Sequence, residues 1–321
     1  MRVFVTAAGL IALASAGSLS AQPYPARPIT VVVPAPAGGP TDIVGRQIAQ
    51  VLGPQLGQNV IVENRGGAGN TIGSDYVAKA KPDGYTLVVG SPSSHAIAPS
   101  IYPKLPYDPV KDFSPIIMMV TAPLALVIHP SVPAPNLKAF IALAKARPGQ
   151  LNFGSGGSGT TSHLTGEYFN LAAGTKVIHV PYKGSGPATT ELIAGQIQMM
   201  FIGVHSSIPL IKTGRLRGLG VTSTRRSDLI PELPTLDEAG LRGFQVYTWY
   251  GVLGPAGMPR PVVDTLNAAI AKGMSDEAVR QRLATQGLDV VTGTPEQFGE
   301  ALVREINTWG KVVKQSGAKA D

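Results

Sequence analysis

The stretch PAPAGGPTD, residues 34–42, decides how the chain folds. The apolar run ITVVV precedes it, and the periodic run IVGRQIAQVLGPQL follows it. This order predicts a strand, then a Gly/Pro loop, then a helix. The free N–H groups of a first helical turn attract anions, so the loop is a candidate cradle for an anionic group. Its candidate residues are Ala37, Gly38, Gly39, Thr41 and Asp42.

The same order of elements recurs along the rest of the chain. Strands are predicted at 29–33, 59–63, 85–90, 115–120, 124–129, 151–154, 176–180, 196–202, 215–222 and 244–252. Helices are predicted at 41–56, up to residue 78, at 137–147 after an Asn136 N-cap, at 163–173, from Pro187, and at 261–274, 276–287 and 295–315. Alternating strands and helices predict an α/β fold with mainly parallel sheets, each flanked by helices.

The strands fall into two clusters, one before about residue 120 and one after about residue 124. The C-terminal helices have no sheet of their own, so we expect them to return and cover the first cluster. The chain would then cross between lobes near 121–124 and 249–254. We therefore predict two hinged lobes, 22–122 plus 252–321 and 123–251, with a ligand cleft between them.

The N-terminus predicts export. Residues 1–21, MRVFVTAAGLIALASAGSLSA, combine one Arg, an apolar stretch and small residues, which is typical of a secretory signal peptide. No later run reaches the roughly 18 apolar residues of a membrane span. An exported protein is not expected to use ATP or NAD, because those cofactors are held in the cytoplasm.

Composition excludes several classes of site. The 321 residues include no Cys, which excludes disulfides, thiolate zinc sites and Cys nucleophiles. The 27 basic and 20 acidic residues give a net charge of +7, but the Lys and Arg are scattered. Nucleic-acid binding is not expected, since it normally leaves a clustered basic footprint.

Further strand-to-helix loops carry hydroxyl and glycine residues like the first. In an open α/β sheet such loops lie at the carboxyl ends of strands, where ligands bind. Lys183 is basic and could pair with a ligand carboxylate, although a solvated loop Lys is an equal alternative. The candidates in these loops are Ser91, Ser93, Ser155, Gly156, Ser158, Gly159, Thr160, Thr161, Tyr182, Lys183 and Gly184.

Nucleotide motifs do not fit. Residues 154–159, GSGGSG, match G-x-G-x-x-G, but no acidic residue follows the next strand at 176–183 as a dinucleotide site requires. The P-loop pattern is absent from the sequence.

Hydrolase and metal chemistry are also poorly supported. G-x-S-x-G is absent, although His163 lies near several serines, His95 follows Ser94, and Asp42 could orient a His. A secreted Ser–His hydrolase of a small carboxylic ester therefore stays an alternative, but no catalytic residue is assigned. The five histidines show no i, i+4 pair, so no metal site is expected.

Several stretches together resemble the periplasmic solute-binding receptors of tripartite tricarboxylate transporters, the Bug family. They include VVVPAPAGGPTDIVGR, LNFGSGGSGTTSHLTGEYF and HVPYKGSGPATTELIAGQI. In order, the matching stretches cover residues 31–46, 60–87, 102–116, 151–169, 179–197, 215–240 and 250–267. They span nearly the whole chain after the predicted signal peptide.

The resemblance implies a two-lobed, Venus-flytrap fold of the periplasmic binding protein kind. It implies a monomeric periplasmic receptor, without a cofactor, that delivers a small (di)carboxylate or aromatic acid to membrane transporter subunits. In such receptors the PxGGxTD-like loop and the Gly/Ser/Thr loop of the second lobe cradle a carboxylate, and ordered waters link it to the first lobe. A sensory receptor with the same pocket stays an alternative.

One departure from the family pattern concerns the strand end at 195–203. Many relatives read GQxDxMFDN there, whereas this chain reads GQIQMMFIG, which puts Gln198, Ile202 and Gly203 at those positions. If Ile202 and Gly203 face the cleft, a ligand ammonium group lacks an anionic partner, which disfavours an amino acid. We expect His205 to contact a second carboxylate or a polar substituent.

Overall fold

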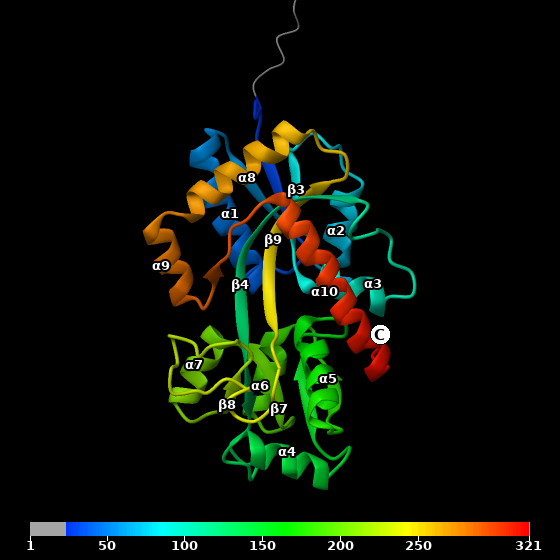
Figure 1. Ribbon diagram of the computed structural model, residues 1–321, viewed down its shortest axis with the longest axis vertical. Helices are drawn as coiled ribbons and strands as arrows, with labels where there is room; N and C mark the ends of the chain where they lie inside the picture. The colour runs from blue at the N-terminus through cyan, green and yellow to red at the C-terminus, as the bar shows by residue number, and fades with distance from the viewer. Residues whose placement is uncertain (1–23, 321) are drawn as a thin grey trace, which may run out of the picture.

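A computed structural model of the chain describes residues 24–320 (Figure 1). The predicted signal peptide, residues 1–21, lies outside them. The strands in the described part are β1 (Ile29–Val33), β2 (Val60–Asn64), β3 (Thr86–Gly90), β4 (Phe113–Ile128), β5 (Asn152–Ser155), β6 (Ile178–Pro181), β7 (Met199–Gly203), β8 (Arg217–Val221), β9 (Tyr247–Pro255) and β10 (Asp289–Val290).

The α-helices of the same part are α1 (Pro40–Leu56), α2 (Thr71–Ala78), α3 (Ala98–Ile101), α4 (Leu137–Ala146), α5 (Thr161–Ala173), α6 (Ser185–Ile193), α7 (Val204–Lys212), α8 (Arg260–Met274), α9 (Glu277–Thr285) and α10 (Pro295–Ser316). A 3₁₀ turn, η1 (Ala68–Asn70), and a π-helical segment, η2 (Pro92–Ile97), lie between strands and helices. As predicted, Asn136 is the N-cap of α4 and its side chain accepts from the Ala139 N–H.

The strands form one sheet in the order β2-β1-β3-β9-β4-β7-β5-β6, and β8 and β10 also pair with β4. Pairing is parallel within β2-β1-β3 and within β7-β5-β6. Strands β4 and β9 are antiparallel to their neighbours. The two parallel groups are therefore joined by two long antiparallel strands.

Strand β4 runs through both halves of the molecule, and β9 lies beside it (Figure 1). Its first part pairs with β9 as far as Pro123, and from Leu124 it pairs with β7 and β8. The sequence predicted two strands here, at 115–120 and 124–129, with Pro123 between them. Proline lacks a backbone N–H, and here it lies where β4 exchanges one partner for the next, so little pairing is lost.

The upper half in Figure 1 is a sheet covered on both faces. Side chains alternate along β1, so Val31 packs with Val44 of α1 and Ile270 of α8, whereas Val32 joins the cluster on the other face that includes Phe298 of α10. The C-terminal helices thus return to the first sheet, as the sequence predicted. Helix α10 also contacts α5 of the lower half.

The lower half buries aromatic side chains under α5. The rings of Phe169, Phe201 and Phe244 lie with centroids 6.0 to 6.4 Å apart. Met200 and Ile202 point to the other face, into the cluster covered by α6 and α7. Truncating one of these buried Phe side chains to Ala is expected to cost about 3–5 kcal/mol.

Candidate functional site

The loop between β1 and α1 is built as the sequence predicted. Gly38 has φ +83°, a conformation that favours glycine, and Gly39 is the N-cap of α1. Ala37 and Gly38 are exposed, and Gly39 is half-buried. Gly39 offers no side-chain cap, and Pro40 follows it at the start of the helix. The first turn of α1 therefore keeps backbone N–H groups at an accessible helix end.

Asp42 orders this loop from within. Its side chain is buried, and Oδ2 accepts from the Gly38 N–H and from Arg46 Nε, each at 2.9 Å. Its Oδ1 accepts from Asn64 Nδ2 at 3.0 Å. Burial opposes ionisation, but the bonds from Arg46, Gly38 and Asn64 outweigh it and hold the pKa of Asp42 below its usual value. Asp42 was a candidate ligand contact; its position makes it a brace of the loop.

Thr41 is buried, and its side chain interacts with that of Tyr250 on β9. Burial raises the pKa of Tyr250, and the interaction with Thr41 works in the opposite direction. The first loop and strand β9 are therefore directly connected.

In the lower half, the loop after β5 is closed by its own hydrogen bonds. The Ser155 side chain is fully buried, and its Oγ accepts from the Gly157 N–H at 3.1 Å. Thr160 is the N-cap of α5, accepts from the His163 N–H, and donates to the Gly157 carbonyl at 2.7 Å. Ser158 is half-exposed in this loop. The loop is thus a fixed surface rather than a loose connection.

The loop after β6 packs directly against it. The Gly184 N–H donates to the Gly156 carbonyl at 3.2 Å, and a Cβ at Gly156 would lie 3.1 Å from Ser185 Oγ. Position 156 therefore has little room for a side chain. Lys183 is exposed, and Tyr182 is half-buried beside the apolar cluster of the lower half, with its pKa raised by burial and then by Glu191.

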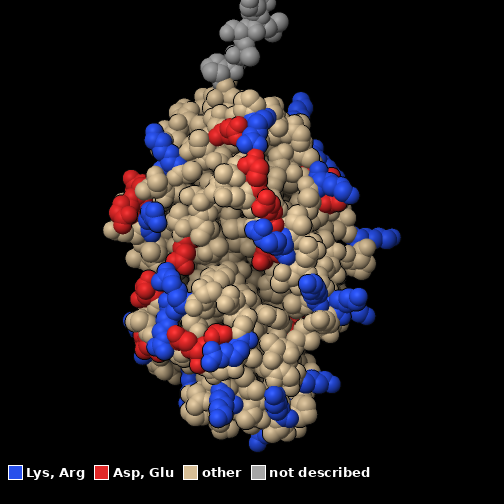
Figure 2. All heavy atoms as spheres, in the orientation of Figure 1, with Lys and Arg blue, Asp and Glu red and all other residues tan. Residues whose placement is uncertain are grey.

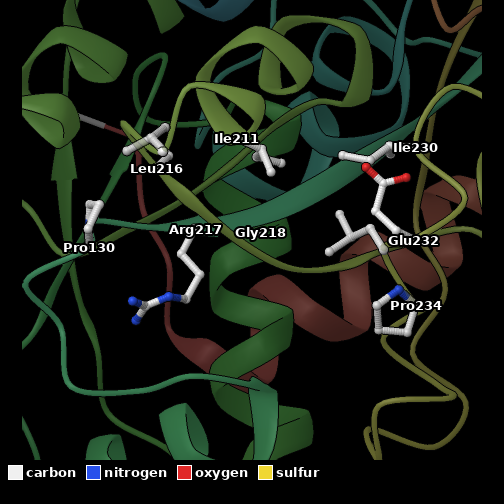
Figure 3. Close-up of a pocket in the computed structure, with 10 residues that line it drawn as sticks. Pro130, Ile211, Leu216, Arg217, Gly218, Ile230, Glu232 and Pro234 are labelled. Carbon is white, nitrogen blue, oxygen red and sulfur yellow. The ribbon is translucent and has the colours of Figure 1, made fainter.

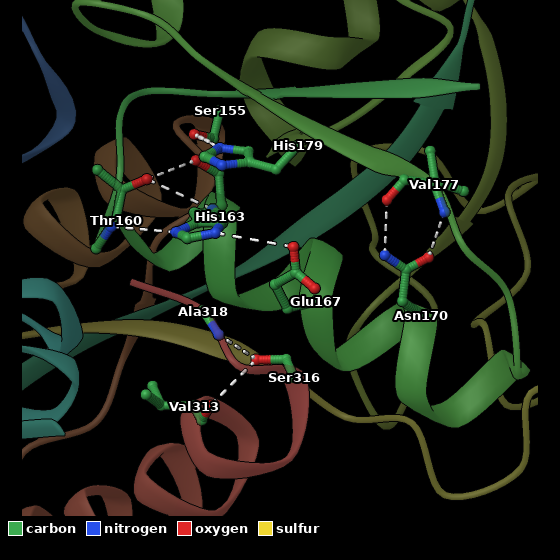
Figure 4. Close-up of polar contacts among 12 residues, drawn as sticks. Ser155, Thr160, His163, Glu167, Asn170, Val177, His179, Val313, Ser316 and Ala318 are labelled. Carbon is green, nitrogen blue, oxygen red and sulfur yellow. Dashed lines mark hydrogen bonds and ion pairs between the residues drawn. The ribbon is translucent and has the colours of Figure 1, made fainter. Parts of the chain in front are cut away.

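Two imidazoles lie beneath the loop after β5 (Figure 4). His179 Nε2 is 2.6 Å from Ser155 Oγ, and the Gly159 N–H donates to His163 Nδ1 at 3.1 Å. The two rings are stacked with centroids 3.7 Å apart and 12° between their planes. Glu167 Oε1 is 3.8 Å from His163 Nε2, and burial raises the pKa of Glu167.

The serines after β3 have two different structural roles. Ser91 and Ser94 form a capping box for η2, and Ser94 Oγ is 2.8 Å from His95 Nδ1. His95 is fully buried, and burial lowers its pKa to about 3. Ser93 reaches the other half: its Oγ accepts from the Thr161 N–H at 3.2 Å. The candidates Ser93 and Thr161, 68 residues apart, are thus brought together at the start of α5.

His205 lies at a contact between the two halves. It is exposed in the first turn of α7, and its Nδ1 is 2.9 Å from the Thr285 carbonyl at the end of α9. This contact links the two halves on the side of the molecule where Arg225 and Asp289 also approach within 3.8 Å. The contact of His205 with a ligand stays a prediction.

The three positions that depart from the family pattern, Gln198, Ile202 and Gly203, have different surroundings. Ile202 is buried in the core, and Gln198 Oε1 accepts from the Asn152 N–H where β5 begins. The condition that Ile202 faces the cleft is therefore not met. Gly203 is the N-cap of α7, and a Cβ there would meet nothing within 4 Å. Of these three positions, only Gly203 lies at a helix start with open space beside it.

Sequence reasoning missed the loop 64–70. Ala68 and Asn70 adopt φ of 44° and 75°, which are unusual for residues with a Cβ and cluster at functional sites. A Cβ at Gly66 would lie 3.0 Å from Pro36, so this loop supports the first cradle. A Cβ at Gly159 would lie 3.5 Å from the Tyr102 hydroxyl, which places Tyr102 where the halves meet. The signal available was a further Gly-rich strand-to-helix loop, NRGGAGN.

Two surface cavities lie elsewhere. One, of about 420 Å³, is lined mainly by apolar side chains around Arg217 and Glu232 of the lower half (Figure 3). The other, of about 700 Å³, lies beside α2 and includes Tyr76 and Asp83. Neither contains a candidate residue. On the face drawn in Figure 2, acidic and basic side chains are interspersed.

Comparison with known proteins identifies the family. The tripartite tricarboxylate transporter family receptor, TctC, matches residues 44–318. The chain belongs to this family. As a TctC receptor it is similar to Protein BugT of Bordetella pertussis, with 38% identity over 318 residues that cover 99% of this chain and 96% of BugT.

Two solved structures are similar to this TctC receptor over their full length. Rpa4515 of R. palustris, with adipate, is 34% identical with a TM-score of 0.86, and the match covers 93% of this chain and 100% of that one. MatC from Rhodopseudomonas palustris, with bound malate, is 35% identical with a TM-score of 0.82, covering 90% and 100%. The predicted two-lobed receptor fold is thereby confirmed.

No helix within 24–320 has the length and apolar character needed to cross a bilayer. Over the same range, no group of three or more His, Asp or Glu side chains is arranged to hold a metal ion.

Proposed function

We propose that this TctC-family chain is a periplasmic receptor that captures a small organic carboxylate between two lobes. The ligand class is a dicarboxylate or an aromatic acid, and the receptor presents it to membrane subunits of a tripartite transporter. Relatives determined with adipate and with malate support the ligand class. Export by the signal peptide and action as a monomer are parts of the same proposal.

The observation that carries the proposal is the contact between the two candidate loop regions across the hinge. Ser93 beside the first sheet and Thr161 at the start of α5 already hydrogen-bond. The exposed Gly38 and the half-buried Gly39 stand at the start of α1 in the upper half. A carboxylate reaching both helix starts would accept charge-assisted bonds worth about 1.5–3 kcal/mol each.

The strand pairing supports a proposal for the lobe boundaries. We propose lobes of 22–122 plus 252–321 and of 123–251, with the ligand cleft between them. Strand β4 leaves β9 at Pro123 and joins β7 and β8 from Leu124. A ligand that contacts both lobes favours the closed form, because only that form makes all the contacts.

We propose further that the ligand is released unchanged. Two Ser–His pairs lie at the candidate loops, Ser94 with His95 and Ser155 with His179. Both of these serine side chains are fully buried, which leaves their hydroxyls no access to a substrate carbonyl. The pair of Ser131 with His129 is exposed, but it lies outside the candidate loops.

A thermal-shift screen of the mature chain tests the proposal. Malate, adipate, benzoate, aspartate and glutamate are compared with the corresponding amides. Ligand binding to the native state stabilises it by mass action and so raises the melting temperature. A ligand concentration a hundredfold above Kd adds about 2.7 kcal/mol to the free energy of unfolding. We expect shifts with one or more non-amino acids and none with the amides. No shift with any acid overturns the proposal, and so does product formation detected by mass spectrometry.

A further inference from the structure

The loop proposed to hold the carboxylate rests on a buried aromatic stack. His163 on α5 and His179 on β6 stack face to face at 3.7 Å (Figure 4). Phe153 of β5 lies against His179 at 4.9 Å. The His163 side chain is only 4% exposed. Three rings from one helix and two neighbouring strands therefore form the floor of the loop.

Each imidazole holds a different point of the loop. His179 Nε2 is 2.6 Å from Ser155 Oγ, and that oxygen in turn accepts from the Gly157 N–H. His163 Nδ1 accepts from the Gly159 N–H. The Gly157 and Gly159 amides are thus turned inward, which fixes the direction of the peptide groups between and after them.

The two rings are themselves held in place. An Nδ1 that accepts from Gly159 carries no proton, so the imidazole proton of neutral His163 is on Nε2, on the side of Glu167 at 3.8 Å. Asn170 ties α5 to the segment before β6, because its amide donates to the Val177 carbonyl and accepts from the Val177 N–H (Figure 4). Helix α5 and strand β6 cannot shift apart without breaking both bonds.

We propose that His163 and His179 are positioning residues for the carboxylate loop 155–161. They do not touch the ligand; they fix the amides and hydroxyls that do. This inference rests on the proposed carboxylate function. Ligand affinity should depend on the hydrogen-bonding atoms of the two imidazoles, Nδ1 of His163 and Nε2 of His179, more than on their charge or volume.

The test uses variants that keep or remove those atoms. Asn places an amide group near the position of Nδ1, and Gln places one near Nε2, so His163→Asn and His179→Gln should keep the contacts. His163→Ala and His179→Ala remove them. His129→Ala is the matched control, because His129 Nδ1 lies 2.7 Å from Ser131 Oγ in an exposed turn away from the loop.

Calorimetric titration with malate and with adipate gives the dissociation constants. We expect the Ala variants to bind roughly tenfold to a hundredfold more weakly, the range seen when groups that orient metal ligands are lost. His163→Asn and His179→Gln should stay within about threefold of the wild type, as should His129→Ala. The double Ala variant should lose less than the product of the single losses, since both rings hold one loop.

Hydrogen exchange in the ligand-free protein supplies a second reading. The amides of Gly157 and Gly159 should exchange at least about tenfold faster in the Ala variants, whereas Gly38 should not change. Equal affinity and equal exchange in the wild type and the Ala variants overturn the inference. So does a loss in His163→Asn and His179→Gln as large as in the Ala variants. If the wild type binds neither acid, the proposed function is overturned, and exchange alone decides whether the imidazoles order the loop.

Discussion

Replacing Asp42 with Asn removes the brace of the first loop while keeping its shape. In the native chain Oδ2 accepts from the Gly38 N–H and from Arg46 Nε, and Oδ1 accepts from Asn64. The Asn side chain can still accept a hydrogen bond from Asn64 through its oxygen. Its NH₂ group then faces the Gly38 N–H and Arg46 Nε, which are both donors. Two bonds to a buried carboxylate are lost.

The expected cost follows from those two bonds. Hydrogen bonds to charged groups contribute about 1.5–3 kcal/mol each, and the loop relaxes in part, so we expect Asp42→Asn to lower the free energy of unfolding by about 2–4 kcal/mol. The pKa of Asp42 is lowered in the folded state, so its contribution is present above the unfolded pKa and is lost as pH falls through the folded pKa. The difference between variant and wild type should therefore be full at pH 7 and shrink below about pH 4.

Denaturant unfolding at several pH values measures the difference. The control is Asp228→Asn, because Asp228 pairs with Arg225 on the surface with 87% of its side chain exposed. That change should stay within about 0.5 kcal/mol. A loss below 0.5 kcal/mol for Asp42→Asn at pH 7, or a loss that does not depend on pH, refutes the assignment of Asp42 as the brace.

Three other changes have definite expected outcomes. His95 is buried with its pKa lowered to about 3, so the unfolded chain binds a proton below pH 6.5 that the folded chain does not. Between pH 6.5 and pH 3 this group should therefore lower the free energy of unfolding by about 1.4 kcal/mol per pH unit. Denaturant unfolding at several pH values should show that His95→Asn lacks this contribution. Gly203→Asp puts an anion into open space at the start of α7 and should weaken dicarboxylate binding by about tenfold or more in calorimetry, whereas Gly203→Ala should not. Glu305 accepts from the indoles of Trp249 and Trp309, the only two in the sequence, and burial raises its pKa. The tryptophan emission should change with pH as this carboxyl titrates above its usual range, and Glu305→Gln should abolish that change.

The sequence predicted the elements that carry strong periodicity and the loops that carry glycine. The strand at 29–33 and the helix that follows it were found within one residue of their predicted bounds. The C-terminal helices were placed over the correct sheet, because they had no strands of their own to cover. The sequence could not show that β4 is continuous, since Pro123 is a breaker in isolation and is tolerated only where the strand changes partners.

Several residue roles in the candidate site could not be predicted from a single sequence. Gly and Ser residues named as ligand contacts include several that hold the loops themselves, such as Ser91 and Ser155. Thr161 lies at the start of α5, and its partner Ser93 comes from the other half. Helix α7 was not predicted, and so the contact of His205 with the end of α9 could not be anticipated. These roles depend on which residues lie opposite in space, which neither periodicity nor composition encodes.

The central claim is that a carboxylate group is what the two lobes recognise. Calorimetric titration of the mature chain with adipate, malate and the diamides of both tests it directly, because each pair differs only in the charged oxygens. The account predicts measurable binding of at least one acid and a diamide weaker by a hundredfold or more, as about 3 kcal/mol of charge-assisted bonding requires. A diamide that binds as well as its acid, or an absence of binding by both acids, would contradict it.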